Sequence, residues 1–433
     1  MGLEPWVPGL LAVLALILLG VPIAFAMALT GTVGLIMLLG PSGALSIAGQ
    51  TLFDTGLSYT LSVVPLFILM GNLVTRAGLS QKLYEFCYVW VGARRGGLPM
   101  ATALACGGFS AVCGSSLATA ATIGKVALPS MRHYGTSDSL AAGVIAAGGT
   151  LGILIPPSVI LVIYGISTGT SIGALFIAGI VPGVLGIIGY MAAVRVTCAL
   201  DPSAAARGPS STAKEKLWAT IRVLPIVLLF LLVIGGIYTG FFTATEAAGV
   251  GAFGAFLLAL LSGRLTPRSF AEALAETAST TTMMFTILAG ALIFAKFIAF
   301  SGLPQTLSTG LGEAALPPFV VLCAILLVYL VLGMVLESLS MVLLTVPIFV
   351  PIVAELGYDL VWFGILVVVM TEISLITPPV GLNVFVLKTV MPDVALGTIF
   401  KGVVPFILAD IVRVAVLLAF PALTLFLPSL MMS

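Results

Sequence analysis

Charged residues are scarce in this sequence. Asp, Glu, Lys and Arg make up 8% of its 433 residues, against about 25% in soluble globular domains. The 17 basic and 16 acidic residues could not cover the surface of a soluble protein of this size, whereas apolar residues reach 60% and the mean hydropathy is +1.27. Lipid must therefore be the solvent for most of the surface, where long apolar runs form helices. The composition predicts an all-α polytopic membrane protein.

Side chains that carry metal or nucleophilic chemistry are also few. The single histidine, His133, excludes a multi-histidine metal site. The five cysteines include no Cys-x-x-Cys pair and lie in apolar stretches, which is typical of buried thiols. An intramembrane enzyme would need a nucleophile–base pair or a metal cluster, so we expect no enzymatic activity and no cofactor. The net charge of +1 excludes nucleic-acid binding by phosphate neutralisation.

One hydrophilic connection interrupts the apolar sequence, between Arg195 and Arg222. It carries five basic residues against two acidic ones, which predicts a cytoplasmic location. Both termini are then expected in the periplasm, and the chain in a bacterial inner membrane that it crosses many times. The first residues contain Glu4 but no Lys or Arg, so we expect no cleavable leader. The apolar runs predict helices that include 21–39 and 396–428.

The chain repeats itself at an offset of 222 residues. Pro156-Pro157 falls on Pro378-Pro379, and Ser116 falls on Ser338. With the N-terminus outside and the linker inside, the first half crosses the membrane an odd number of times, so the second half enters with the opposite orientation. We therefore expect two inverted-topology repeats joined by a cytoplasmic linker. In chain order, the first repeat, the linker and the second repeat cover residues 1–200, 201–221 and 222–433.

Two tips rich in small or polar residues lie between apolar segments that are short for a membrane span. They indicate re-entrant hairpins over about 98–131 and about 316–352, because backbone leaves a helix at mid-membrane depth only where protein or a cavity satisfies it. The alternative is two pairs of ordinary spans with small-residue packing faces.

The two Pro-Pro pairs related by the 222-residue offset each predict a broken helix, one over about 138–166 and the other over about 359–391. Proline lacks an N–H group and forces its predecessor out of the helical region. The break frees carbonyls upstream, which can coordinate Na⁺, and amides downstream, which can face an anionic substrate. A structural kink is the alternative, but two breaks in symmetric positions favour a functional role.

Charges inside the membrane are costly and therefore need an explanation. Glu337 lies at the tip of the second hairpin, where a functional role is expected. Lys125 and Lys296 are open between a functional role and snorkelling to the interface. Glu246 is interpreted as a charge at a helix N-terminus. The role of Glu372 is left open.

Four segments resemble signatures of the large membrane subunit of tripartite ATP-independent periplasmic (TRAP) transporters. They are residues 240–248 (GFFTATEAA), 108–116, 155–158 and 376–383. The family more often has proline at position 244 and serine at position 113. The resemblance, which covers nearly the whole chain, implies an elevator-type fold similar to the ion transporter superfamily. It also implies a sodium-driven importer of a small organic acid, such as sialic acid or a C4-dicarboxylate.

The resemblance further implies two protein partners. A periplasmic binding protein would deliver the solute, and a small membrane subunit would complete the part in the bilayer. The alternative is a stand-alone sodium/organic-anion symporter with a similar inverted-repeat fold. The identity of the organic acid is left open.

The resemblance implies two sodium sites beside the hairpin tips, with Na⁺ as the coupling ion. The first, carried over by position, comprises Ser110, Cys113, Ser115, Gly152, Ile155 and Pro157. The second, placed by the 222-residue offset, comprises Glu337, Ser338, Ser374, Thr377 and Pro379. The candidate substrate-binding residues are Ser115, Ser116, Ser158, Glu337, Asn383 and Lys296. Neutral oxygens can bind Na⁺, and bound cations then offset a substrate carboxylate in a low dielectric.

Overall fold

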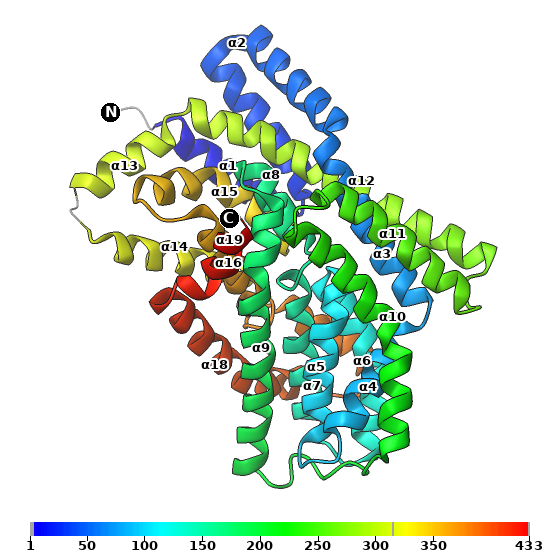
Figure 1. The fold of residues 1–433 in the computed structure, drawn as a ribbon. Helices are drawn as coiled ribbons and strands as arrows, with labels where there is room; N and C mark the ends of the chain where they lie inside the picture. Colours follow the sequence, from blue (N-terminus) through cyan, green and yellow to red (C-terminus); the bar gives the residue numbers. More distant parts are fainter. Residues whose placement is uncertain (1–3, 314–315, 432–433) are drawn as a thin grey trace.

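The computed structural model describes residues 4–313 and 316–431, and every regular element in these two ranges is a helix (Figure 1). Eight of the described helices are long and apolar enough to cross a membrane. Several shorter apolar helices lie between them. The prediction of an all-α polytopic membrane protein is therefore confirmed.

The first half of the chain contains nine α-helices and two short 3₁₀ turns within the described residues. They are α1 (Trp6–Leu18), α2 (Ile23–Leu57), η1 (Tyr59–Ser62), α3 (Val63–Arg76), α4 (Leu79–Val91), α5 (Gly97–Cys113), α6 (Ser116–His133), α7 (Asp138–Thr150), η2 (Leu151–Ile153), α8 (Val159–Thr168) and α9 (Ile172–Leu200).

The second half follows the hydrophilic connection. Its described helices are α10 (Ala213–Tyr238), α11 (Ala244–Leu261), α12 (Pro267–Phe300), α13 (Leu303–Glu313), α14 (Pro318–Gly333), α15 (Ser338–Glu355), α16 (Leu360–Ser374), α17 (Leu382–Val390), α18 (Leu396–Ala419) and α19 (Ala422–Met431).

Helix limits recur at the offset found in the sequence. Adding 222 to both ends of α6 gives both ends of α15, and adding 222 to the start of α7 gives the start of α16. The two halves therefore share the order of a helical hairpin followed by an interrupted helix. The opposite orientations of the two halves and the domain limits stay predictions, because the structure contains no bilayer.

Two predicted helices differ from the structure. The helix expected over 21–39 continues to Leu57, with a kink at Gly40, whose φ is +80° and which precedes Pro41. Proline is favourable in the first turn of a helix, so residues for which no helix was predicted form a second arm there. The helix expected over 396–428 ends at Ala419, because Pro421 forces Phe420 out of the helical region (φ −130°, ψ 73°).

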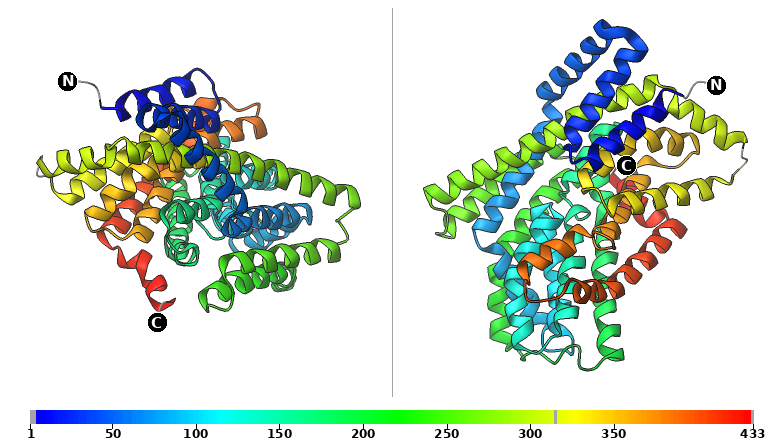
Figure 2. Two further views of the ribbon diagram at one scale, coloured as in Figure 1. Left: turned by 90° about the horizontal axis from the view of Figure 1, so that it is seen from above. Right: turned by 180° about the vertical axis from the view of Figure 1, so that it is seen from behind.

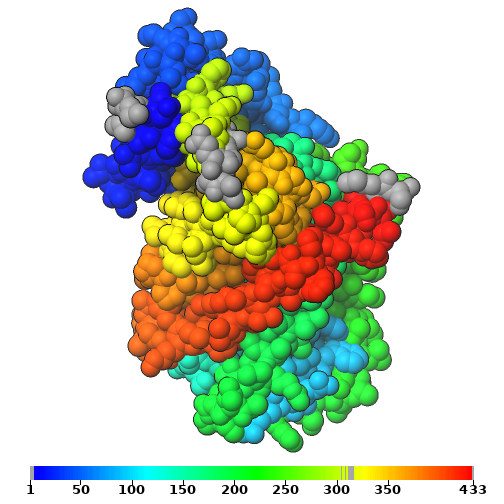
Figure 3. Space-filling model, turned by 90° about the vertical axis from the view of Figure 1, so that its left-hand side faces the viewer, coloured from blue at the N-terminus to red at the C-terminus, as the bar shows by residue number. Residues whose placement is uncertain are grey.

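The long helices α2 and α12 lie side by side, and α11 packs against α3. Seen from above in Figure 2, α12 extends across much of the width of the molecule. Figure 3 shows α18 and α19 as a red band between the yellow of α14 and the green of α9. Helices α2, α3, α11 and α12 therefore form a frame beside the hairpins and the interrupted helices.

Helices from the two halves approach each other at backbone distance. A Cβ atom on Gly143 of α7 would lie 2.0 Å from the carbonyl oxygen of Gly402 in α18. Small residues permit this approach, and dispersion contacts hold helices together in lipid. The inner helices of the two halves are therefore packed as one body around the segments described below.

Candidate functional site

The Pro156-Pro157 and Pro378-Pro379 pairs each interrupt a helix, as predicted. Helix α7 ends at Thr150, passes through the η2 turn, and resumes as α8 only after Pro156 and Pro157. Helix α16 ends at Ser374, and α17 begins eight residues later, after Pro378 and Pro379. The first break is buried, whereas Pro378 and Pro379 are exposed.

Ser158 holds the first break together. Its hydroxyl donates to the carbonyl of Ile153 and accepts from the amide of Leu161 at 3.3 Å, so it bridges the two halves of the helix. The side chain is fully buried. The structure therefore assigns this candidate substrate residue a local contact on each side of the break.

A polar side chain caps the helix that follows each hairpin tip. Ser115 accepts from the amide of Ala118 at 3.4 Å at the start of α6. Glu337 accepts from the amides of Leu339 and Ser340 at 3.1 and 3.2 Å at the start of α15. Negative charge is favourable at a helix N-terminus, which explains how a carboxylate can lie at the second tip.

The two tips and the two breaks converge on one small cavity of about 70 Å³. The polar lining comes from Ser115 and Ser116 on the first tip and from Glu337 and Ser338 on the second. Other lining residues, such as Ile153 and Leu375, flank the breaks, and Met284 of α12 closes one side. This volume has room for a few water molecules only.

Most residues of the predicted first sodium site lie around one contact between tip and break. A Cβ atom on Gly152 would lie 2.7 Å from the carbonyl oxygen of Ser115, so only glycine allows this approach. On the other side of the tip, a Cβ atom on Gly114 would lie 2.9 Å from the carbonyl oxygen of Pro157. Ser110 is buried one turn before Gly114, and its hydroxyl donates to Cys106 O at 2.6 Å.

The other two residues of this set flank the same contact. Cys113 is the last residue of α5, directly before the tip, and Ile155 directly precedes the Pro-Pro pair. The structure thus brings the tip and the break together, and their role in ion binding stays a prediction.

The predicted second sodium site has a similar arrangement. The hydroxyls of Ser374 and Thr377 donate to carbonyls of α16 at 2.7 and 2.6 Å, so their oxygen lone pairs face away from those bonds. Glu337 and Ser338 lie at the adjacent tip and line the cavity. Pro379 is exposed at the break.

Two candidate substrate residues hydrogen-bond to each other. Asn383 is fully buried, accepts from Ser116 Oγ at 2.8 Å and donates to Ala146 O at 3.0 Å. By contrast, Lys296 is exposed on α12 and is not among the residues that line the cavity. Lys125 is also exposed.

Ion pairs hold the base of the first hairpin, at the end opposite its tip. Arg132 contacts Asp138 at the start of α7 and Asp393 in the loop before α18, each at 2.7 Å. The hydrogen bond from Arg132 lowers the pKa of Asp393 below its ordinary value. The first hairpin is thus tied to both halves of the protein at its base.

Sequence reasoning missed two residues beside the predicted sodium sites. The hydroxyl of Thr119 is buried without a hydrogen-bond partner among the described residues, and it would lie 3.0 Å from a Cβ atom on Gly152. Gly333, at the end of α14, approaches Ser374 so closely that a Cβ atom would lie 2.1 Å from its hydroxyl. The 222-residue offset did not reveal either contact, because both depend on how the hairpin packs.

The structure also explains two of the acidic residues. Glu246 accepts from the amide of Thr243 at 2.8 Å in a capping box, so the interpretation as a helix N-terminal charge is confirmed. Glu372 is fully buried and pairs with Arg413 of α18 at 2.5 Å. Its partner lies 41 positions away on another helix, which is why the sequence left its role open.

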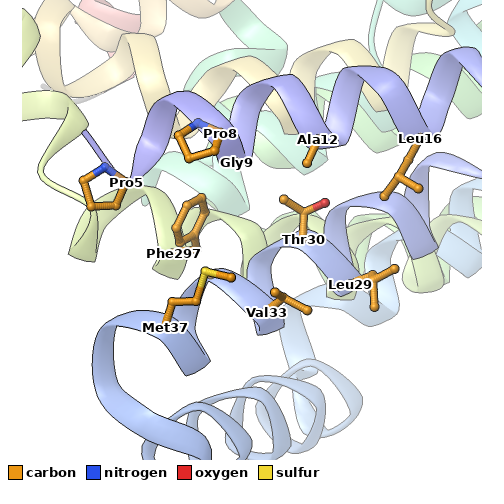
Figure 4. Close-up of a pocket in the computed structure, with 11 residues that line it drawn as sticks. Pro5, Pro8, Gly9, Ala12, Leu16, Leu29, Thr30, Val33, Met37 and Phe297 are labelled. Atoms are coloured by element: carbon orange, nitrogen blue, oxygen red, sulfur yellow. The ribbon is translucent and has the colours of Figure 1, made fainter. Parts of the chain in front are cut away.

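A larger cavity lies elsewhere, between α1, α2 and α12 (Figure 4). It has a volume of about 340 Å³ and is lined by apolar side chains such as Leu16 and Phe297, with Thr30 as a polar exception. An organic acid needs polar or charged partners, which this lining does not offer. The cavity between the tips is therefore the better candidate for solute chemistry.

The fold is that of a membrane transporter. The chain resembles the YdaH transporter of Alcanivorax borkumensis, with a TM-score of 0.68 and 15% identity, over 96% of this chain and 97% of that one. It also resembles MtrF of Neisseria gonorrhoeae, which belongs to a class of antimetabolite efflux pumps, with a TM-score of 0.54 and 14% identity, over 97% of this chain and 95% of that one. These similarities establish the fold alone.

The chain belongs to the family described as "Tripartite ATP-independent periplasmic transporter, DctM component", which residues 10–423 match. It is 37% identical to a C4-dicarboxylate TRAP transporter large permease protein of Pseudomonas aeruginosa, over 91% of this chain and 92% of the relative. It is 35% identical to the sialic acid large permease protein of Vibrio cholerae and 33% identical to the ectoine large permease protein of Halomonas elongata, each over 96% of this chain and 97% of the relative.

Family membership confirms the resemblance drawn from the sequence. The chain is a multi-pass subunit of a TRAP transporter and not an enzyme. The finding also favours a multicomponent transporter over the stand-alone symporter.

Proposed function

We propose that this chain is the translocating subunit of a sodium-coupled importer of a small organic acid. The observation that carries the proposal is the convergence of both hairpin tips and both helix breaks on one cavity with polar groups in its lining. Helix breaks at membrane depth are tolerated where they line a cavity, and in inverted-repeat transporters such breaks form the substrate and ion sites.

Sodium is the coupling ion that the donor groups favour. Around Gly152 the available ligands are the carbonyl oxygen of Ser115 and the hydroxyl of Thr119, and the carbonyl oxygen of Pro157 lies beside Gly114 at the same tip. These are hard, neutral oxygens, which suit a hard monovalent cation and leave a net positive charge after binding. Two such sites would attract the carboxylate of the solute, because electrostatic attraction is strong in a medium of low dielectric.

An elevator movement accounts for the size of the cavity. About 70 Å³ admits a few water molecules but no organic acid of four or more carbons. We infer that the solute enters when a hairpin tip moves away from the broken helices. The helices packed around Gly143 and Gly402 would then carry the solute as one body past the frame of α2, α3, α11 and α12.

Relatives suggest the solute class and the partners. They are named for C4-dicarboxylates, sialic acid, ectoine and isethionate, which are all small and carry an acidic group. We propose that a periplasmic binding protein delivers a solute of this kind, that a small membrane subunit completes the complex, and that the complex works in a bacterial inner membrane with the termini outside.

Reconstitution tests this function. Proteoliposomes with this chain alone should show no uptake, whereas the chain with its small subunit and the loaded binding protein should take up solute along an inward Na⁺ gradient. Uptake by the full set that is equally fast when K⁺ replaces Na⁺ would contradict sodium coupling. Rapid uptake by the chain alone would show that no partner is needed.

A further inference from the structure

A network of buried polar side chains, called the polar network below, connects the two interrupted helices. Thr150 Oγ1 of α7 lies 3.3 Å from Tyr190 Oη of α9, and Tyr190 donates to Asp410 Oδ2 of α18 at 2.8 Å. Arg413 Nη2 of α18 then lies 2.8 Å from Asp410 Oδ1 and 2.5 Å from Glu372 Oε2 of α16. All five side chains are at most 4% exposed.

The two ends of this polar network occupy equivalent positions in the two halves of the protein. Thr150 and Glu372 are 222 residues apart, which is the offset of the repeat. Thr150 lies two residues before Gly152 of the first predicted sodium site, and Glu372 lies two residues before Ser374 of the second. The polar network therefore links the last turns of the two helices that lead into the sodium sites.

The packing around the polar network leaves its side chains little freedom to rearrange. A Cβ atom on Gly186 of α9 would lie 2.4 Å from Arg413 Nη1, so the guanidinium fills the space that the glycine provides. Tyr190 stands one turn further along the same helix and packs edge-on against Phe406 of α18, with ring centroids 5.6 Å apart. Breaking one link would leave a further buried polar or charged group without its partner, which is costly, so we expect the members to shift together.

We propose that this polar network couples the two sodium sites, so that Na⁺ at one site strengthens Na⁺ binding at the other. The inference rests on the sodium sites proposed above. Tyr190 is a positioning residue in it: its hydroxyl is the uncharged link between Thr150 on one side and the ion pairs of Asp410 and Arg413 on the other. Coupling between two sites typically changes affinity by roughly 5- to 150-fold, which makes binding cooperative.

The test measures how Na⁺ raises the unfolding temperature of the purified full-length chain, at constant ionic strength with choline as the replacing cation. Stabilisation by a bound ion grows as RT times the logarithm of the binding polynomial, so its slope against ln [Na⁺] gives the mean number of ions bound at each concentration, and the steepness of that binding curve reports cooperativity without transport. In the parent protein we expect a Hill coefficient of roughly 1.4 to 1.8, which is the value that this range of coupling gives for two sites. Tyr190→Phe removes one hydroxyl, and it should lower the coefficient to roughly one while Na⁺ still stabilises the protein.

Tyr329→Phe is the matched control. Tyr329 is fully buried, and its hydroxyl has no hydrogen-bond partner among the described residues, so this variant should keep the parental coefficient. Glu372→Gln alters the other end of the polar network and leaves Arg413 with one carboxylate. It should also lower the coefficient, and it decides the matter if Tyr190→Phe does not fold.

Several results would overturn the proposal. If Tyr190→Phe and Glu372→Gln keep the parental Hill coefficient, or if Tyr329→Phe lowers it equally, the polar network does not couple the sodium sites. A parent that binds Na⁺ with no cooperativity contradicts the coupling but leaves the sodium sites standing. A parent whose stability does not respond to Na⁺ contradicts the sodium sites themselves.

Discussion

Ser116 donates a 2.8 Å hydrogen bond to Asn383, and this contact joins the tip of the first hairpin to the second broken helix across 267 positions of sequence. Asn383 also donates to the carbonyl of Ala146 in α7. One side chain at the start of α17 thereby fixes the position of two elements of the other half.

Asn383→Ala should therefore destabilise the fold. It leaves the buried hydroxyl of Ser116 without its acceptor, at a cost of about 1–3 kcal/mol, and removes the additional bond to the carbonyl of Ala146 in α7. Thermal unfolding of the purified protein measures the effect. Asn72→Ala is the control, because Asn72 donates one bond to Thr277 in a partly buried contact. Equal losses in the two variants would contradict the role assigned to Asn383.

Gly152→Ala should separate the first tip from the first break. The added Cβ atom would lie 2.7 Å from the carbonyl oxygen of Ser115, so the tip must move and the proposed ligands with it. We expect Na⁺ to stabilise this variant less than the parent protein at the same concentration, because only the second proposed site remains intact. Gly49→Ala, at a helical glycine with open space around its Cα, should leave the response to Na⁺ intact. A normal Na⁺ response in Gly152→Ala would rule out a site at this contact.

The membrane orientation can be tested at Ser210, which is exposed in the hydrophilic connection between α9 and α10. A cysteine at this position should react with a membrane-impermeant thiol reagent only in inverted vesicles, because the excess of basic residues predicts a cytoplasmic location. Cys198 is buried at the end of α9 and should react little in either preparation. Labelling of Ser210→Cys from the outside of intact cells would reverse the proposed topology.

The sequence predicted the features that depend on local chemistry. A proline pair in the middle of an apolar run interrupts a helix, so both breaks could be read directly at Pro156-Pro157 and Pro378-Pro379. The third pair, Pro317-Pro318, lies at the start of α14. The second arm of α2 was missed because Gly40 and Pro41 also begin many loops, and packing decides between the two outcomes.

Features that depend on packing between distant segments could not be predicted. The partners of Glu372 and the proximity of Thr119 to Gly152 arise when helices far apart in the sequence pack together. A buried acid in a membrane helix still indicated that a partner was needed, although not which one.

The most direct test of the central claim is the Na⁺ dependence of solute uptake in proteoliposomes that contain all partners. Ser115→Ala and Thr377→Val each remove one hydroxyl from a proposed sodium site with little change in volume. Each should raise the half-saturating Na⁺ concentration by roughly 10- to 150-fold, which corresponds to about 1.5–3 kcal/mol for a hydrogen bond to a charged group. Ser137→Ala removes a comparable helix cap at the start of α7, and Ser279→Ala removes an exposed hydroxyl of α12, so both should behave like the parent. If Ser115→Ala and Thr377→Val show the parental half-saturating concentration, the tips and breaks do not bind the coupling ion.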